Sequence, residues 1–492
     1  MRAETIILLS MAVPLGGAGL IALTGSRPNL RETVTLTSAA TLFALVASLL
    51  PEVAAGGRPA VTMVEMMPGL AIALEVEPLG ALFAAVASFL WIVTSVYSIG
   101  YMRGHGEHNQ TRFYVCFAVA LASTMGIAFS ANMLTLFIFY EALTLSTYPL
   151  VTHSGTREAV RAGRIYLGLL LGTSIGFQLL AVLWTWSAAG TLDFTPGGIL
   201  AGRADGPVVG ILLFLYVFGI GKAALMPFHR WLPAAMVAPT PVSALLHAVA
   251  VVKAGVFTVL KVTVYIFGLD LLGGLGVSQW LAYVAAATVI IASLVALVMD
   301  NLKLRLAYST VSQLSYIVLG AMLVNSWSVL GGGMHIAMHA FGKITLFFCA
   351  GAIMVASHKT EVSQMRGIGR TMPVTTFAFL IGSLSLIGLP PMGGMWSKWY
   401  LALGAASAEQ LIFVGVFMIS SLLNIAYLMP VVVRGFFYAP ERPNPPDAGS
   451  ASPIREAPLT CVAALSLTAV GCVVMFFNAG RIHAFLQPIL GG

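Results

Sequence analysis

The chain has 492 residues, of which 59% are hydrophobic and 9% are charged, and its mean hydropathy is +0.93. Soluble domains carry roughly 25% charged residues, so the composition excludes a soluble enzyme and predicts a polytopic membrane protein. The formal net charge of +7 comes from basic residues spread over short connections, a pattern that fits membrane topology better than nucleic-acid binding.

The sequence carries no pattern typical of a bound cofactor or metal. Its cysteines are scattered without CxxC spacing, which argues against zinc, iron–sulfur and disulfide frameworks. It also has no phosphate-binding loop and no dinucleotide fingerprint after a strand. We therefore predict a transporter subunit with no redox or hydrolytic site of its own, and we expect no cofactor and no metal.

Apolar runs define the predicted spans, because a membrane helix needs ~20 apolar residues. We predict an all-α polytopic membrane protein with about fourteen transmembrane helices, at 4–24, 33–51, 78–101, 113–130, 132–152, 164–188, 207–228, 241–265, 275–299, 304–323, 330–356, 373–403, 411–438 and 457–479. The corresponding domains are N-terminal helices 1–3 (1–110), a first repeat (111–270), a second repeat (271–440), and a polar loop with the final helix (441–492).

Lysine and arginine are distributed unequally between the two sets of connections. Sixteen lie in odd-numbered connections and only Arg2, Arg58, Arg203 and Arg481 lie on the other side. By the positive-inside rule the odd connections are cytoplasmic, so both termini should face outward. The expected location is the cell membrane.

Two of the predicted spans contain a proline break beside a lysine. Span seven carries Lys222 and is expected to break at Pro227, and span twelve breaks at Pro390-Pro391 before Lys398. These spans are five apart, an odd offset, so repeats that contain them would be inverted. Inverted repeats with discontinuous helices at matching positions indicate a transport site.

Glu141 and Lys222 are the first candidate proton carriers. Each lies in the middle of a predicted span, where a charge is costly and points to function. A structural ion pair is the alternative for Glu141, but a pair with Lys222 would itself form a switch, because breaking it releases a proton. Lys253 in span eight has the same character.

Histidines and further lysines extend this set. His335, His339 and Lys343 recur every fourth residue, so they share one helix face. A proton relay is the favoured interpretation; structural packing and a metal pair are alternatives, but the metal pair lacks a third ligand. Lys398 could be the terminal proton carrier of the second half. His247 is either a relay member or a satisfied polar residue.

Lys303 lies at a predicted cytoplasmic loop, where topological charge and a relay role both remain open. Together the candidates recur along the middle of the chain, as lateral proton transfer requires. None of them resembles a catalytic triad.

Several motifs resemble one known family across nearly the whole chain. The sequence is similar to the antiporter-like subunits of respiratory complex I, the D-type subunits of Mrp sodium/proton antiporters and the related subunits of membrane-bound hydrogenases. The resemblance rests on IFYEALTLSTYPLV, GKAALMPFHRWLPAAM, PTPVSALLHAVAVVKAGVF, LKLRLAYSTVSQLSYI, HIAMHAFGKITLFFCAG and IGLPPMGGMWSKWY.

The resemblance implies fourteen helices with inverted five-helix repeats in spans four to eight and nine to thirteen. It also implies roles for individual positions: Glu141 pairs with Lys222, Lys253 connects, His339 and Lys343 form the central relay, and Lys398 ends it. One departure is Ala234, where the family commonly has an acidic residue after WLP.

These features predict a proton-translocating subunit of a multisubunit cation/proton antiporter of Mrp D type. Its partners would be other membrane subunits, protons, Na⁺ or K⁺ and the lipid bilayer, with no nucleic acid. The alternatives are a proton-pumping subunit of a complex I-like or hydrogenase complex, and the membrane subunit of an inorganic-carbon-uptake complex. A scaffold that no longer conducts is disfavoured, because each buried charge costs ~2.5–3.5 kcal/mol on insertion scales.

Overall fold

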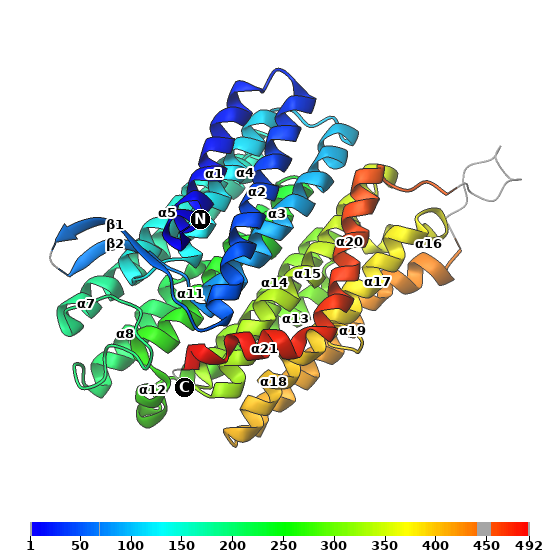
Figure 1. Ribbon diagram of the computed structural model, residues 1–492. Helices are drawn as coiled ribbons and strands as arrows, with labels where there is room; N and C mark the ends of the chain where they lie inside the picture. The colour runs from blue at the N-terminus through cyan, green and yellow to red at the C-terminus, as the bar shows by residue number, and fades with distance from the viewer. Residues whose placement is uncertain (1, 68, 440–453, 491–492) are drawn as a thin grey trace, which may run out of the picture.

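The computed structural model describes residues 2–67, 69–439 and 454–490, and it is built mainly of helices (Figure 1). Eleven helical segments in these residues are long and apolar enough to cross a membrane, as a multi-pass membrane protein requires. They are α1 (Ala3–Leu23), α2 (Pro28–Ala54), α3 (Pro78–Gly104), α4 (Gln110–Ala128), α5 (Met133–Val151), α6 with α7 (Arg157–Ala189), α10 with α11 (Thr240–Phe267), α13 (Gln279–Val298), α15 (Ser326–Ser357), α19 (Leu411–Phe437) and α20 (Leu459–Phe477).

Three predicted spans are absent from that set, each for a visible reason. The span expected at 207–228 is α8 (Gly206–Gly219), followed by a 3₁₀ turn (Gly221–Ala223) and the short α9 (Trp231–Ala234). The span expected at 373–403 is divided into α17 (Pro373–Ile387) and α18 (Gly394–Ser407). The span at 304–323 is α14 (Leu302–Met322), which is helical but rich in hydroxyl and charged side chains. The total of fourteen spans therefore stays a prediction.

The centre of the molecule is the segment Thr240–Phe267, in which every residue is buried. It consists of α10 (Thr240–Ala244), a π turn (Leu245–Val249), α11 (Val251–Val262) and a second π turn (Thr263–Phe267). Another π turn (Ser174–Gln178) separates α6 (Arg157–Thr173) from α7 (Leu179–Ala189). Such turns interrupt the regular α-helical hydrogen bonds and are frequent at functional sites.

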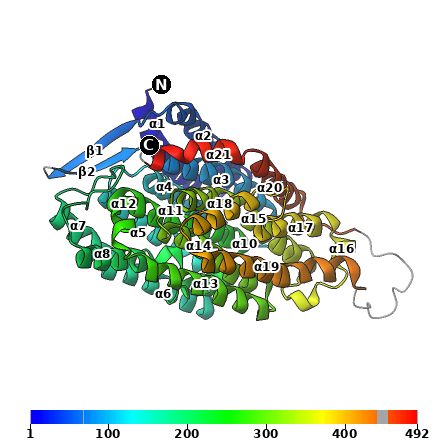
Figure 2. The same cartoon turned by 90° about the horizontal axis from the view of Figure 1, so that it is seen from below.

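The prediction of an all-α protein misses one β-hairpin. Strands β1 (Ala60–Met67) and β2 (Leu70–Glu75) pair antiparallel, with Ala60 opposite Glu75, and the hairpin projects from one end of the bundle (Figures 1 and 2). Strand residues from Val61 to Val64 are mostly β-branched, the local signal for this structure. Four large apolar side chains of β1 are exposed: Met63, Val64, Met66 and Met67.

The remaining elements are short. They are α12 (Leu269–Leu275), a 3₁₀ turn (Ala235–Val237), another at Val362–Gln364, α16 (Ile368–Thr371), α21 (Ala479–Leu486) and a final 3₁₀ turn (Gln487–Leu490). α21 turns away from α20 and lies beside α2 and α3 (Figures 1 and 2). The polar loop predicted at 441–457 lies largely outside the described residues.

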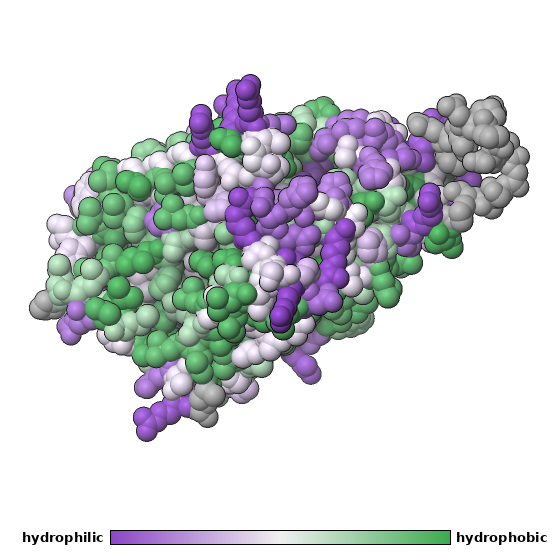
Figure 3. All heavy atoms as spheres, turned by 90° about the horizontal axis from the view of Figure 1, so that it is seen from above, coloured by the Kyte–Doolittle hydropathy of each residue, from purple (hydrophilic) through white to green (hydrophobic). Residues whose placement is uncertain are grey.

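The connections separate onto two faces of the bundle. On one face, Arg31 donates a hydrogen bond to Gln110 (2.8 Å), joining the α1–α2 and α3–α4 ends. Viewed from above, this face gathers hydrophilic atoms toward the middle and right, while apolar atoms dominate the left (Figure 3). On the opposite face, Asn132 pairs with Asp193, and the Ile199 N–H donates to the Ile266 carbonyl (2.9 Å). The connections on the first face are odd-numbered and rich in lysine and arginine. Those on the opposite face are even-numbered and poor in them.

Candidate functional site: buried lysines and histidines

Lys222 lies where α8 ends, and its side chain points to α5. Its Nζ donates hydrogen bonds to the Tyr140 carbonyl (2.7 Å) and to Thr144 Oγ1 (2.6 Å), and it lies 3.1 Å from the centroid of the Tyr140 ring. The Lys222 backbone N–H donates to the Tyr140 hydroxyl (3.0 Å). The residue is fully buried, and neutral oxygens and an aromatic face make the close contacts of its Nζ.

The ion pair predicted between Glu141 and Lys222 is absent from this conformation. No carboxylate lies within 4.0 Å of Lys222 Nζ among the described residues, and both buried carboxyl oxygens of Glu141 have no hydrogen-bond partner there. Tyr140 and Thr144 are four residues apart and share one face of α5. Glu141 is turned about 100° from Tyr140 and about 60° from Thr144.

The break that positions Lys222 comes at Ile220, seven residues before the expected Pro227. Gly221 and Gly255 allow this, because a Cβ on Gly221 would lie 2.2 Å from Thr173 Oγ1, and one on Gly255 would lie 2.3 Å from the Lys222 carbonyl carbon. The indole Nε1 of Trp231 donates to the Gly221 carbonyl (2.9 Å), which also accepts from the Ala224 N–H (3.0 Å), so two hydrogen bonds hold the turn at the break.

Lys253 and His339 meet at the interface of α11 and α15. Lys253 Nζ and His339 Nδ1 share a hydrogen bond of 2.5 Å, and both residues are buried. The Nε2 atom of His339 has no hydrogen-bond partner among the described residues. This contact joins the first half of the chain to the second.

The other two candidate residues of α15, His335 and Lys343, contact different neighbours. His335 shares a hydrogen bond through Nδ1 with Ser397 Oγ of α18 (2.8 Å), and its ring centroid is 5.6 Å from that of His339. Lys343 Nζ donates to Ser309 Oγ of α14 (2.9 Å) and more weakly to the Leu306 carbonyl (3.3 Å). No group of three or more potential metal ligands occurs in the described residues.

Lys398 lies in the first turns of α18, directly after the second helix break. Its Nζ donates to the Ile387 carbonyl at the end of α17 (3.2 Å) and to Ser421 Oγ (3.3 Å), and it lies 4.9 Å from the centroid of the Tyr316 ring. A lysine at the carbonyl end of a helix is favoured by the helix dipole. The Tyr316 ring also stacks on His335 at 5.9 Å.

The two candidates left open, His247 and Lys303, form no hydrogen bond with the other candidate residues. His247 lies in the π turn of the central segment and shares a hydrogen bond with Thr310 Oγ1 (3.1 Å), while its Nε2 has no partner in the described part of the chain. Lys303 Nζ donates to the Ala238 carbonyl (2.6 Å) at the start of that segment.

Sequence reasoning missed several residues that complete these contacts. Tyr140 and Thr144 hold Lys222, and Ser397 contacts His335. Each of them contacts a charged or titratable residue on another helix, and one sequence cannot reveal which helices pack together. Tyr427 donates from its hydroxyl to Ser309 Oγ (2.9 Å) and extends the network to α19.

One buried lysine differs from the others in having an acidic partner. Lys261 is buried with its Nζ 3.6 Å from Glu77 Oε1, and it donates to the Ser130 carbonyl (2.7 Å). Glu77 also caps α3 by accepting from the N–H groups of Leu79 and Gly80, each at 2.8 Å. By contrast, no ion pair within 4.0 Å is formed in the described residues by Lys222, Lys253, Lys343 or Lys398.

Comparisons with known proteins place this chain in a family. The transmembrane family model of NADH:quinone oxidoreductase/Mrp antiporter proteins matches residues 130–424. The chain is 33% identical over 436 residues to NADH-quinone oxidoreductase subunit N of Desulforudis audaxviator, covering 86% of this chain and 85% of that protein. It is 32% identical over 350 residues to NAD(P)H-quinone oxidoreductase chain 5 of Synechocystis, covering 66% of this chain and about half (48%) of that relative.

Among solved structures, the Mrp complex of Dietzia contains a chain of the same fold, with a TM-score of 0.87 at 23% identity, covering 100% of this chain and 97% of the other. The antiporter-like resemblance seen in the motifs is thereby confirmed. The chain belongs to the NADH:quinone oxidoreductase/Mrp antiporter transmembrane family.

Proposed function

We propose that this protein moves protons across a membrane as the antiporter-like subunit of a multisubunit complex. The observation that carries the proposal is the set of four buried lysines that have no carboxylate within 4.0 Å among the described residues, namely Lys222, Lys253, Lys343 and Lys398. Burial without a counter-charge penalises an ammonium group, so a small movement of a carboxylate can decide whether such a lysine holds its proton.

The proposed order of transfer follows the contacts. Glu141 approaches Lys222 to stabilise its charge and withdraws to release the proton. Protons then pass through Lys253 and His339, which are directly hydrogen-bonded. From the histidine pair they reach Lys398 by way of His335 and Ser397, or they reach Lys343 on α15, which contacts Ser309 of α14.

The same proposal includes two inverted repeats and outward termini. Lys222 and Lys398 both follow helix breaks, one after α8 and the other between α17 and α18, as matching positions of two repeats should. The proposed domain division is therefore 1–110, 111–270, 271–440 and 441–492, with protons and Na⁺ or K⁺ as transported ions in the cell membrane.

Two complexes are candidates for the finer assignment. A cation/proton antiporter of Mrp D type is our first candidate; Lys398 at the end of the proposed path fits the D-type pattern among others. A proton-pumping subunit of a quinone oxidoreductase is the second, favoured by the identity to subunit N over most of both chains.

Everted membrane vesicles that carry the complete set of partner genes test both candidates. A pH-gradient dye is followed after adding Na⁺ or K⁺, for wild type and for Lys222→Ala. Collapse of the gradient that needs the cation and disappears in the variant would support the antiporter. A gradient formed only on adding an electron donor would support the redox complex. Normal transport in Lys222→Ala, with the protein assembled, would contradict proton transfer through Lys222.

A further inference from the structure

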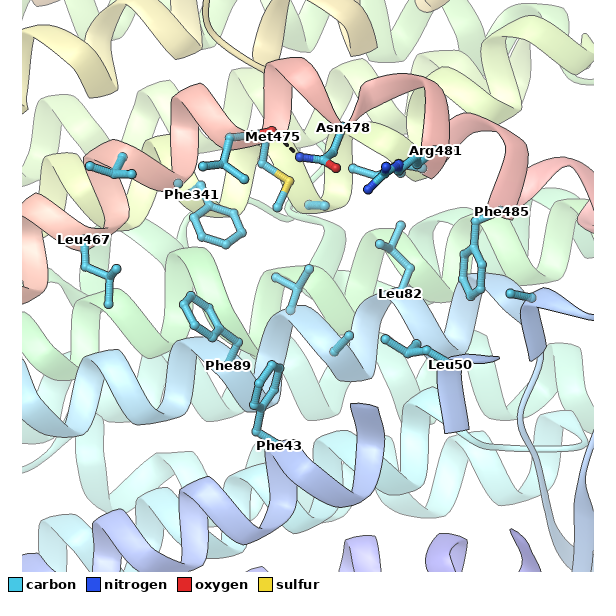
Figure 4. Close-up of a pocket in the computed structure, with 18 of the residues that line it drawn as sticks. Phe43, Leu50, Leu82, Phe89, Phe341, Leu467, Met475, Asn478, Arg481 and Phe485 are labelled. Atoms are coloured by element: carbon cyan, nitrogen blue, oxygen red, sulfur yellow. Dashed lines mark hydrogen bonds between the residues drawn. The ribbon is translucent and has the colours of Figure 1, made fainter. Parts of the chain in front are cut away.

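A groove of about 740 Å³ lies between α2, α3, α15, α20 and α21, away from the proposed proton path (Figure 4). The residues that line it are apolar apart from Asn478 and Arg481. These two lie together toward one end, and Leu467 lies at the other (Figure 4). The groove is open to the surroundings of the protein, because Val470 and Val474 on its wall are 57% and 45% exposed.

The length of the groove matches one leaflet of a bilayer. Along α20 the wall runs from Leu467 to Asn478, and along α2 it runs from Phe43 to Ala54. Eleven residues of α-helix rise about 16 Å, and half of the hydrocarbon core of a membrane is about 15 Å thick. A groove of that length that begins at the surface end of α20 reaches the middle of the bilayer.

The polar end of the groove is built for an anionic group. α20 ends and α21 turns away at Asn478, so Arg481 stands at the surface end of the last span. Within the described residues Arg481 forms no hydrogen bond and no ion pair. Its guanidinium can bind two phosphate oxygens at once. Asn478 is adjacent, with its Nδ2 donating to the Val474 carbonyl (2.9 Å).

We propose that the groove binds one membrane phospholipid, with the phosphate at Arg481 and one acyl chain along α20, α2 and α3. A transmembrane helix of a partner would need an apolar wall across both leaflets, whereas this wall ends at mid-membrane. A free phosphate would have no use for the apolar wall. The positive charge at one end fits an anionic headgroup, and the apolar wall along the rest of the groove fits an acyl chain.

Photocrosslinking tests the site in the full-length protein, purified with its partner subunits and stripped of lipid in a neutral detergent. The probe is a phosphatidylglycerol with a diazirine on its acyl chain, and a diacylglycerol with the same chains serves as the headgroup-free probe. In wild type, the phospholipid should label peptides 43–54, 82–89 and 467–478. Arg481→Gln should reduce that labelling about tenfold at subsaturating probe.

Two further variants keep the test decisive. Arg2→Gln, an exposed arginine at the start of α1, should leave labelling unchanged. Val470→Trp should fill the groove from its exposed side and reduce labelling of 82–89 while Arg481 is intact. Equal labelling of wild type and Arg481→Gln, equal labelling by the diacylglycerol, or labelling spread evenly over α13 and α19 would each overturn the proposal.

Discussion

Lys222 is held by neutral groups that a protonated amine and a free amine can both use. An ammonium group has three N–H donors, and two of them are directed at the Tyr140 carbonyl and Thr144 Oγ1 in this conformation. Thr144 Oγ1 also donates to the Tyr140 carbonyl (3.1 Å). These contacts keep Lys222 pointed at α5, where Glu141 lies one residue from Tyr140.

Thr144→Val should therefore impair proton transport without unfolding the protein. The variant removes one acceptor from Lys222 Nζ, a loss of about 1.5–3 kcal/mol for a hydrogen bond to a charged group, so we expect a rate lower by roughly tenfold or more. The rate is measured by dye quenching in everted vesicles.

Thr147→Val is the matched control, because Thr147 shares its hydrogen bond with Tyr166 (2.6 Å) instead of with Lys222. It should retain most of the transport rate. An equal loss in both variants would show that Thr144 acts by stabilising α5 rather than by holding Lys222.

At the scale of elements, the broken helices depend on close backbone approach. α11 passes so near the break after α8 that a Cβ on Gly255 would lie 2.3 Å from backbone atoms of Lys222 and Ala223. Backbone atoms on both sides leave no flexible side chain that could move aside. The position of Lys222 is thus coupled to the packing of α11.

Gly255→Ala should lower stability by about 1–3 kcal/mol through overpacking, and it should reduce proton transport because Lys222 is displaced. Gly415→Ala on α19 is the control, because a Cβ there meets nothing within 4 Å and the better helix propensity should be neutral or stabilising. Thermal unfolding in detergent ranks the two variants. A Gly255→Ala protein as stable as wild type would contradict the tight contact.

Asp300 and Ser363 join two connections on the face that carries most of the arginine residues, and this contact should depend on pH. The hydroxyl and the backbone N–H of Ser363 donate to Asp300, the N–H at 2.9 Å, and these hydrogen bonds hold the pKa of Asp300 below its ordinary value. The stabilisation is fully present above the unfolded-state pKa of about 3.8 and is lost as the pH falls through the lower folded pKa. Hydrogen exchange of residues 360–364 should accelerate in that acid range, and in Ser363→Ala the acceleration should largely disappear.

At the scale of the whole molecule, the two faces predict the orientation in the membrane. His108 and Thr195 are exposed on opposite faces. With Cys116 replaced by serine, His108→Cys should react with an impermeant maleimide in everted vesicles and Thr195→Cys in right-side-out cells. The reverse pattern would place the arginine-rich connections outside and contradict the proposed orientation.

Much of this architecture follows from the sequence, because the membrane restricts the choices. Long apolar runs can only be helices there, so the predicted spans agree with the structure at most positions. Charges beside prolines also mark the breaks near Lys222 and Lys398. The β-hairpin at 60–75 is not predicted, because it lies outside the long apolar runs and its only signal is a short β-branched stretch.

The neighbours of each candidate residue could not be predicted in the same way. That Tyr140 and Thr144 rather than Glu141 contact Lys222 depends on the rotation of α5 about its own axis. That Lys261 pairs with Glu77 depends on how α11 packs against the start of α3. Both contacts depend on tertiary packing, which cannot be predicted from the mean hydropathy or from residue spacing within one helix.

α15 has 32 residues, so it is about 48 Å long, whereas the hydrocarbon core of a bilayer is about 30 Å thick. A helix of that length stays within the core only if it is inclined. Charge that moves along an inclined α15, from His335 toward Lys343, travels partly parallel to the membrane plane. Only the part of that displacement along the membrane normal does work against the transmembrane potential. Voltage should therefore act less on the steps along α15 than on the steps that bring protons to Lys222 and release them beyond Lys398.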